Sequence, residues 1–258
     1  MFQLSRRRYA IALGATLLAG CGQVSQALPV STINTSAPPI ATTTSTVVEV
    51  GISAVNQRSG LSTKAAQQKL IDLGFWLLNV DGNYDTTTRQ AVMAFQKYYR
   101  LHPTGSINTA TAWLLDRQKI RPHAQSTSGS QAEVDKSRQL VFLVHDGQTV
   151  FILNASTGDD RKYTEPDGNT PGVMISGTAI TPEGKFRINR ERPEGWWIGD
   201  LGQIYRPKYF SGGIAIHGSY IVPAYPSSHG CVRVSTAAMD MIWDLDLLPR
   251  STRVWVYA

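Results

Sequence analysis

The sequence is poor in cysteine, with only Cys21 and Cys231 in 258 residues. Two cysteines cannot supply the several bridges that hold a small disulfide-rich domain together, so that class of protein is excluded. Charged residues are also scarce, at 17%, whereas hydrophobic residues reach 42%. This composition excludes general disorder and is typical of a globular chain, and the length predicts two folded domains.

Long apolar runs are missing too. The run from Ala10 to Ala19 has about ten residues, which is too few to span a bilayer unaided. It follows Arg6, Arg7 and Arg8 and ends in small residues. This pattern predicts a signal peptide over residues 1–20, and hence an exported protein that faces the cell wall or periplasm.

The segment Leu18-Ala19-Gly20-Cys21 resembles the processing site of bacterial lipoproteins, in which the cysteine becomes the new N-terminus and carries the lipid. We therefore expect a lipid on Cys21 that anchors the protein to the membrane; an ordinary cleaved signal with an incidental cysteine is the alternative. Residues 21–50 are rich in serine, threonine and proline and predict a disordered linker. Cys231 is then left without a disulfide partner. Because a lone exported thiol is exposed to oxidation, its presence indicates chemistry.

Clustered positive charge is absent outside the N-terminus. The net charge is +6, but Arg6, Arg7 and Arg8 belong to the predicted signal peptide and the other cations are scattered along the chain. A surface that follows nucleic-acid phosphates needs a stripe of lysine and arginine. No nucleic-acid partner is therefore predicted.

Residues 51–118 have the apolar periodicity of a small all-α bundle. Gly74 is placed to end the first helix, and a turn at Asp81-Gly82 precedes the second. A third, shorter helix is expected near Thr109. The apolar faces consist of Ala66, Leu70 and Leu73 in the first helix and of Ala91, Val92, Phe95, Tyr98 and Tyr99 in the second.

The spacing of apolar and turn residues in this bundle resembles the peptidoglycan-binding domain of cell-wall hydrolases and synthases. The resemblance implies docking to the wall without catalysis. One departure is Asp85, which stands where the family usually has glycine. A second linker is expected over residues 119–131. The resemblance rests on Leu70, Gly74-Phe75, Asp81-Gly82-Asn83-Tyr84, Thr88, Ala91-Val92, Phe95-Gln96, Gly105 and Thr111.

Residues 132–258 change to the short alternating segments of a mainly β domain. Asp146-Gly147 has the composition of a hairpin turn, and Thr181-Pro182-Glu183-Gly184 is a second turn signal. One helix is expected from Thr236 to Leu245. Strands are expected at Leu140 to Val144, Thr149 to Leu153, Lys185 to Ile188, Ile214 to Ile216 and Val254 to Tyr257.

Cys231 needs a base nearby, because a thiol attacks a carbonyl only once it becomes a thiolate. His229 lies two residues before it and shares its face if the segment is extended, yet a tight turn at Gly230 would break that relation. His217 ends a strand on the other side of a loop, where its ring is carried by fixed backbone. We predict His217 as the base.

Further residues of this motif are suited to binding a substrate. Gly230 lets a carbonyl approach the backbone closely, and the N–H groups of Gly230 and Cys231 are expected to donate to an oxyanion. Arg233 lies one strand step beyond the thiol and is expected to bind a substrate carboxylate, with a structural salt bridge as the alternative. Ser228 and His229 are expected to orient the loop or the substrate.

The pattern Ile216-His217-Gly218 followed by Ser228-His229-Gly230-Cys231-Val232-Arg233 resembles the signature of the YkuD-type L,D-transpeptidases, and the resemblance covers about residues 132–258. It implies a β-sandwich-like catalytic domain, with Cys231 as nucleophile and His217 as base. It also implies that the carbonyl of Gly218 orients the imidazole in place of a triad carboxylate. Neither a metal nor a cofactor is expected.

The reaction that the resemblance implies is the cross-linking of peptidoglycan. Cys231 would attack a donor tetrapeptide stem, release its terminal D-alanine and pass the acyl group from a thioester to an amine of a neighbouring stem. Peptidoglycan stem peptides and glycan are the expected partners, and the sequence does not indicate an oligomeric state. Attack by water would instead make the protein an L,D-carboxypeptidase. A non-catalytic wall-binding lipoprotein is the rival from another class.

Overall fold

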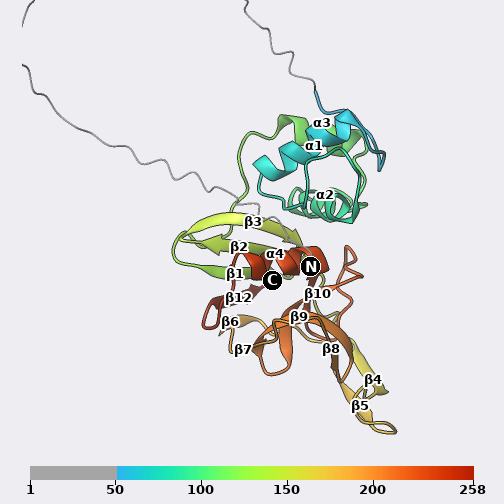
Figure 1. Cartoon of the computed structure of the whole chain (residues 1–258), viewed down its shortest axis with the longest axis vertical. Coiled ribbons are helices and arrows are strands. Elements are labelled where there is room, and N and C mark those ends of the chain that lie inside the picture. Colours follow the sequence, from blue (N-terminus) through green and yellow to red (C-terminus); the bar gives the residue numbers. More distant parts are fainter. Residues whose placement is uncertain (1–50) are drawn as a thin grey trace, which may run out of the picture. The chain divides into compact units, whose positions relative to one another are not determined.

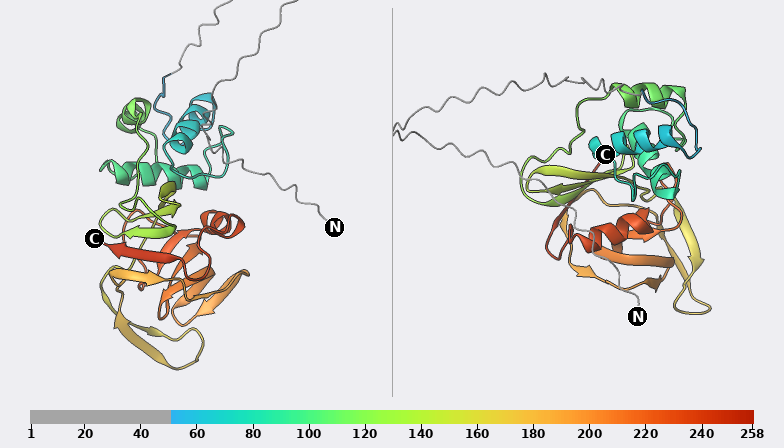
Figure 2. Two further views of the ribbon diagram at one scale, coloured as in Figure 1. Left: turned by 90° about the vertical axis from the view of Figure 1, so that its left-hand side faces the viewer. Right: turned by 45° about the horizontal axis from the view of Figure 1, so that its top comes forward.

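The computed structural model describes residues 51–258, which belong to one compact unit (Figures 1 and 2). The predicted signal peptide, the lipid on Cys21 and the linker at residues 21–50 lie outside the described residues. Within residues 51–258, every helix is too short or too polar to span a bilayer.

The N-terminal part of the described chain is a helical bundle, as predicted. Gly74 follows the first helix with a φ of 91°, in the left-handed region that favours glycine. Asp85, the departure noted above, caps the second helix, where its carboxylate accepts the Thr88 N–H at 2.7 Å. It therefore adds a side-chain cap that glycine lacks. The helices are α1 (Leu61–Asp72), α2 (Thr86–Tyr98) and α3 (Thr109–Arg117).

A five-stranded sheet with the order β3-β2-β1-β12-β6 begins the second part. Its β1 and β12 run parallel, and the other neighbours are antiparallel. Asp146 and Gly147 form the turn between β2 and β3 with φ of 47° and 76°, which confirms the predicted hairpin. The strands are β1 (Gln131–Asp135), β2 (Leu140–His145), β3 (Gln148–Asn154), β6 (Gly184–Arg187) and β12 (Arg253–Tyr257).

A second sheet has the order β11-β10-β9-β7, with β8 also paired to β9, and a separate hairpin is formed by β4 and β5. Both sheets and helix α4 (Thr236–Asp244) contribute to one hydrophobic core, in which Val134, Ile216 and Ile242 are buried. The mainly β, sandwich-like fold was expected. The strands are β4 (Lys162–Pro166), β5 (Met174–Thr178), β7 (Arg190–Glu191), β8 (Trp196–Gly199), β9 (Gly202–Ser211), β10 (Ile214–Ser219) and β11 (Val232–Ser235).

The helical bundle and the first sheet are packed against each other. A second core cluster joins apolar side chains of the bundle, such as Phe75 and Phe95, to Phe142 and Ile152 of the sheet. Figures 1 and 2 show α2 lying beside β3. The expected linker is also held in place, since the Ala124 N–H donates to the Thr149 hydroxyl at 2.7 Å.

Candidate active site

Two neighbouring strands carry the predicted base and nucleophile. His217 lies on β10, Cys231 directly precedes β11, and these strands pair in parallel with His217 opposite Arg233. Because side chains two residues apart share a face of a strand, Cys231 and Arg233 lie on the face to which His217 belongs. The sulfur atom of Cys231 is partly exposed and lies 3.8 Å from the carbonyl oxygen of Gly213. The fold thus places the three residues on or next to two adjacent strands.

The imidazole of His217 is held in one orientation. Its side chain is buried, with 3% exposed, and Nδ1 lies 2.8 Å from the carbonyl oxygen of Gly218. A carbonyl oxygen only accepts hydrogen bonds, so Nδ1 carries the proton and Nε2 keeps a lone pair. The contact to Gly218 is the one that the family resemblance implied. It leaves Nε2 able to accept a proton from a thiol.

Burial favours the neutral form of both groups. Burial lowers the pKa of His217 to about 4; the contact with Gly218 opposes this shift and the positive charge of Arg233 adds to it. Burial also raises the pKa of the Cys231 thiol, against the influence of the Ala215 backbone and of Arg233. Both shifts favour the uncharged forms of the pair, a thiol and an imidazole. A neutral imidazole with a lone pair on Nε2 is suited to accept a thiol proton.

Gly230 shapes the turn before the nucleophile but does not have a free N–H. Its N–H donates to Ser228 Oγ at 3.0 Å, and its carbonyl accepts from Thr181 Oγ1 at 2.6 Å. In this structure a hydroxyl thus occupies the Gly230 N–H that was expected to donate to an oxyanion. Ser228 Oγ in turn donates to the carbonyl of Cys231 at 2.5 Å. Of the two expected donors, the N–H of Cys231 is the remaining candidate.

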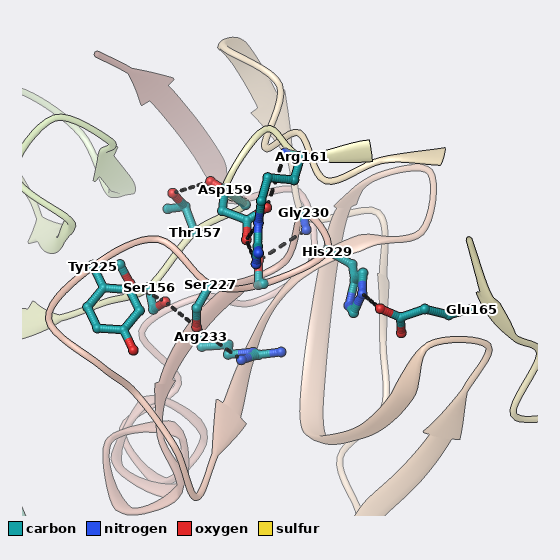
Figure 3. Close-up of polar contacts among 12 residues, drawn as sticks. Ser156, Thr157, Asp159, Arg161, Glu165, Tyr225, Ser227, His229, Gly230 and Arg233 are labelled. Carbon is teal, nitrogen blue, oxygen red and sulfur yellow. Dashed lines mark hydrogen bonds and ion pairs between the residues drawn. The ribbon is translucent and has the colours of Figure 1, made fainter. Parts of the chain in front are cut away.

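His229 contacts strand β4 of the β4–β5 hairpin. Its Nε2 lies 2.9 Å from Glu165 Oε1 (Figure 3). Its ring meets the ring of Tyr163 edge to face, with 4.8 Å between the ring centroids. The turn at Gly230 separates it from Cys231. His229 therefore ties the catalytic turn to the hairpin, and His217 is left as the base.

Arg233 has a fixed backbone and a side chain without an acidic partner in residues 51–258. Its N–H and carbonyl bond to the backbone of Ser156 at 2.9 and 3.1 Å. Its Nη1 lies 3.4 Å from Ser227 Oγ (Figure 3), and no carboxylate of the described chain is within 4.0 Å. The structural salt bridge is thus not formed there, and the guanidinium is available to a carboxylate ligand.

Several supporting residues were not singled out as site residues from the sequence. Thr157 accepts the N–H groups of Ser227 and Ser228 at 2.9 and 3.0 Å, and Thr181 holds the carbonyl of Gly230. The segments Ser156-Thr157-Gly158 and Thr181-Pro182-Glu183-Gly184 also match the family pattern, but the sequence does not show which of their atoms support the site. In residues 51–258 there is no cluster of three histidine, cysteine, aspartate or glutamate side chains that would hold a metal.

Comparison with known proteins identifies the families of the two domains. Residues 129–256 match the sequence profile of the YkuD L,D-transpeptidase catalytic domain, and residues 59–115 match that of a putative peptidoglycan binding domain. A crystal structure of the L,D-transpeptidase from Xylanimonas cellulosilytica is 42% identical with a TM-score of 0.70, and the match covers 78% of this chain and 96% of that one. The chain belongs to the YkuD family of L,D-transpeptidases.

A structure of the L,D-transpeptidase from Stackebrandtia nassauensis is also similar, at 18% identity and a TM-score of 0.43, covering 80% of this chain and 96% of that one. No curated protein matches the sequence. This L,D-transpeptidase therefore has a helical peptidoglycan-binding domain followed by a mainly β catalytic domain, as predicted from the sequence. Its partner is peptidoglycan.

Proposed function

We propose that this L,D-transpeptidase cross-links peptidoglycan stem peptides through a thioester on Cys231. The observation that carries the proposal is the fixed imidazole of His217, whose Nδ1 is bound to Gly218 while its strand lies beside the start of β11. A base with a defined tautomer, on a strand beside the one that a thiol precedes, suits acyl transfer. No carboxylate within residues 51–258 bonds to the ring of His217, and the carbonyl of Gly218 orients it instead.

In the first half-reaction the Cys231 thiol gives its proton to Nε2 of His217, and the sulfur attacks the carbonyl carbon of the third residue of a donor tetrapeptide. The C–N bond to the terminal D-alanine breaks, and the leaving amine takes the proton from the imidazolium. The N–H of Cys231 stabilises the oxyanion of the tetrahedral intermediate. The product is a thioester on Cys231.

In the second half-reaction an amine on a neighbouring stem attacks the thioester. It gives a proton to His217, the C–S bond breaks, and the sulfur takes the proton back to restore the thiol. Arg233 binds a carboxylate of a stem peptide during these steps. We further propose that the protein is exported and anchored through a lipid on Cys21, with its bundle docked on the wall.

Mass spectrometry of the products tests the proposal. The full chain in detergent is incubated with disaccharide-tetrapeptide, beside Cys231→Ala and His217→Ala. A cross-linked dimer with loss of D-alanine, absent in Cys231→Ala, is the expected result. Tripeptide without dimer would show an L,D-carboxypeptidase instead, and unchanged substrate would show a wall-binding protein without catalysis.

A further inference from the structure

The segment that joins the predicted base to the nucleophile has little apolar support of its own. Tyr220 and Tyr225 are 76% and 65% exposed. Val222, which is 4% exposed, is the large apolar side chain of this segment that is well buried. A loop of this kind keeps one conformation only where polar contacts hold its backbone. We call residues 220–227 the catalytic loop.

One contact to the catalytic loop comes from the peptidoglycan-binding bundle. Gln90 on α2 donates from Nε2 to the carbonyl of Val222 at 3.2 Å. Asn154, at the end of β3, donates to the same carbonyl at 3.2 Å and to Oε1 of Gln90 at 2.5 Å. The middle of the loop is therefore held jointly by the bundle and the first sheet.

A second contact begins at Lys97, about two turns further along the same face of α2. Its Nζ donates to the carbonyl oxygens of Gln139 and Ala155, each at 3.0 Å. The side chain is 7% exposed, and burial lowers its pKa to about 7. Burying an amine costs free energy unless its hydrogen bonds are made, so these two bonds fix the backbone around β3.

A series of hydrogen bonds connects Lys97 to the end of the catalytic loop. The side chain of Gln139 binds Thr157 twice at 2.8 Å, and the carbonyl of Thr157 accepts the N–H groups of Ser227 and Ser228. The hydroxyl of Ser156 donates to the carbonyl of Tyr225 at 2.8 Å (Figure 3). Helix α2 is thus connected to the catalytic loop at two places. It contacts the middle of the loop directly, and hydrogen bonds next to the end of β3 connect it to the end of the loop that leads to Cys231.

We propose that α2 is a positioning element of the catalytic site, in which Gln90 and Lys97 hold the catalytic loop and thereby set the geometry at Cys231. The bundle would then have a second role beside wall binding. The effect on turnover rests on the proposed function, but the effect on the thiol does not. A shift of about 1 Å at a reacting group can lower a rate up to about 100-fold, so remote contacts of this kind matter.

The test compares Gln90→Ala and Lys97→Met with the unmodified full chain in detergent. Alkylation of Cys231 by iodoacetamide, followed by peptide mass spectrometry, needs no substrate. We expect its rate to rise about threefold or more, because a loosened loop exposes the thiol. Cross-linking should show kcat lower by about tenfold while KM changes by less than about twofold, since the substrate contacts remain.

Two control variants separate positioning from general loss of stability. Gln68→Ala removes an exposed glutamine of α1 that bonds only to Asp72, and it should change neither readout. Ala112→Gly destabilises the buried face of α3 without touching the loop. Unchanged alkylation and kcat in Gln90→Ala and Lys97→Met would overturn the proposal, as would equal effects in Ala112→Gly. If no variant or parent chain makes product, the proposed function fails while alkylation still decides the positioning role.

Discussion

At the scale of single residues, the catalytic motif depends on two glycines that are crowded by distant parts of the chain. Gly230 has a φ of 133°, and an added Cβ would lie 2.7 Å from the carbonyl oxygen of Ile180. A Cβ on Gly218 would lie 2.8 Å from the ring of Tyr205. Both glycines therefore let neighbouring backbone and aromatic groups close around the site.

We expect Gly230→Ala to lower the free energy of unfolding by about 1–3 kcal/mol, because the side chain meets backbone that cannot move aside. Gly213→Ala is the matched control, since an added Cβ there has no atom within 4 Å. Urea unfolding measures both effects. Equal stability of the two variants would show that the turn at Gly230 can relax.

The pH dependence of the reaction follows from the burial of His217. A base acts in its neutral form, so activity is present above its pKa and is lost as the pH falls through it. We expect the acid limb of kcat/KM to have its midpoint near pH 4 and not near the 6.5 of an ordinary histidine. Steady-state rates at several pH values test this, with circular dichroism as the control for folding. A midpoint near 6.5 would contradict a buried base.

At the scale of elements, α2 is the helix on which both domains depend. It is capped by Asp85, contributes Val92 and Phe95 to the bundle core, and carries Gln90 and Lys97 toward the catalytic domain. Its start is therefore a sensitive point, because a frayed first turn disturbs all of these contacts.

We expect Asp85→Ala to lower the free energy of unfolding by about 1 kcal/mol, since the cap on the Thr88 N–H is lost. Asp85→Asn keeps an acceptor and should cost less, and Asp85→Gly, the residue usual in the family, should cost only a few tenths. Thermal or urea unfolding ranks the three variants. A larger loss for glycine than for alanine would exclude capping as the reason for Asp85.

At the scale of the whole molecule, the two domains share buried surface. Leu140, Phe142, Val144 and Ile152 of the first sheet are at most 2% exposed, and all belong to the core cluster of the helical bundle. Without the bundle these side chains would meet water, at a cost of about 1.5–3 kcal/mol for each large one. The catalytic domain is therefore stabilised by the bundle.

We expect the described part of the chain to unfold in one cooperative transition. Calorimetry should show a single peak, and a tryptophan signal from either domain should change at the same urea concentration. Residues 120–258 expressed alone should be less stable than the full chain or aggregate. Two separated transitions would contradict a shared core.

The sequence by itself determined what local patterns encode: the three helices of the bundle, the turn at Asp146-Gly147, and the motif that contains His217 and Cys231. Periodicity, turn chemistry and motif spacing involve neighbours along the chain, so they can be read without a structure. The strands β4 and β5 escaped prediction because they contain no fully buried residue and no alternation of apolar and polar residues.

Only the tertiary structure decided which of the motif's donors is free and what holds the catalytic loop. The Ser228 hydroxyl accepts the Gly230 N–H, and His229 contacts Glu165. Gln90 donates to the carbonyl of Val222, which lies 132 residues further along the sequence. Such contacts depend on which elements pack together, and no spacing along the chain records that. The family and its motif were therefore predictable from the sequence, whereas the hydrogen bonds between the bundle and the catalytic loop were not, because they arise from packing between distant segments.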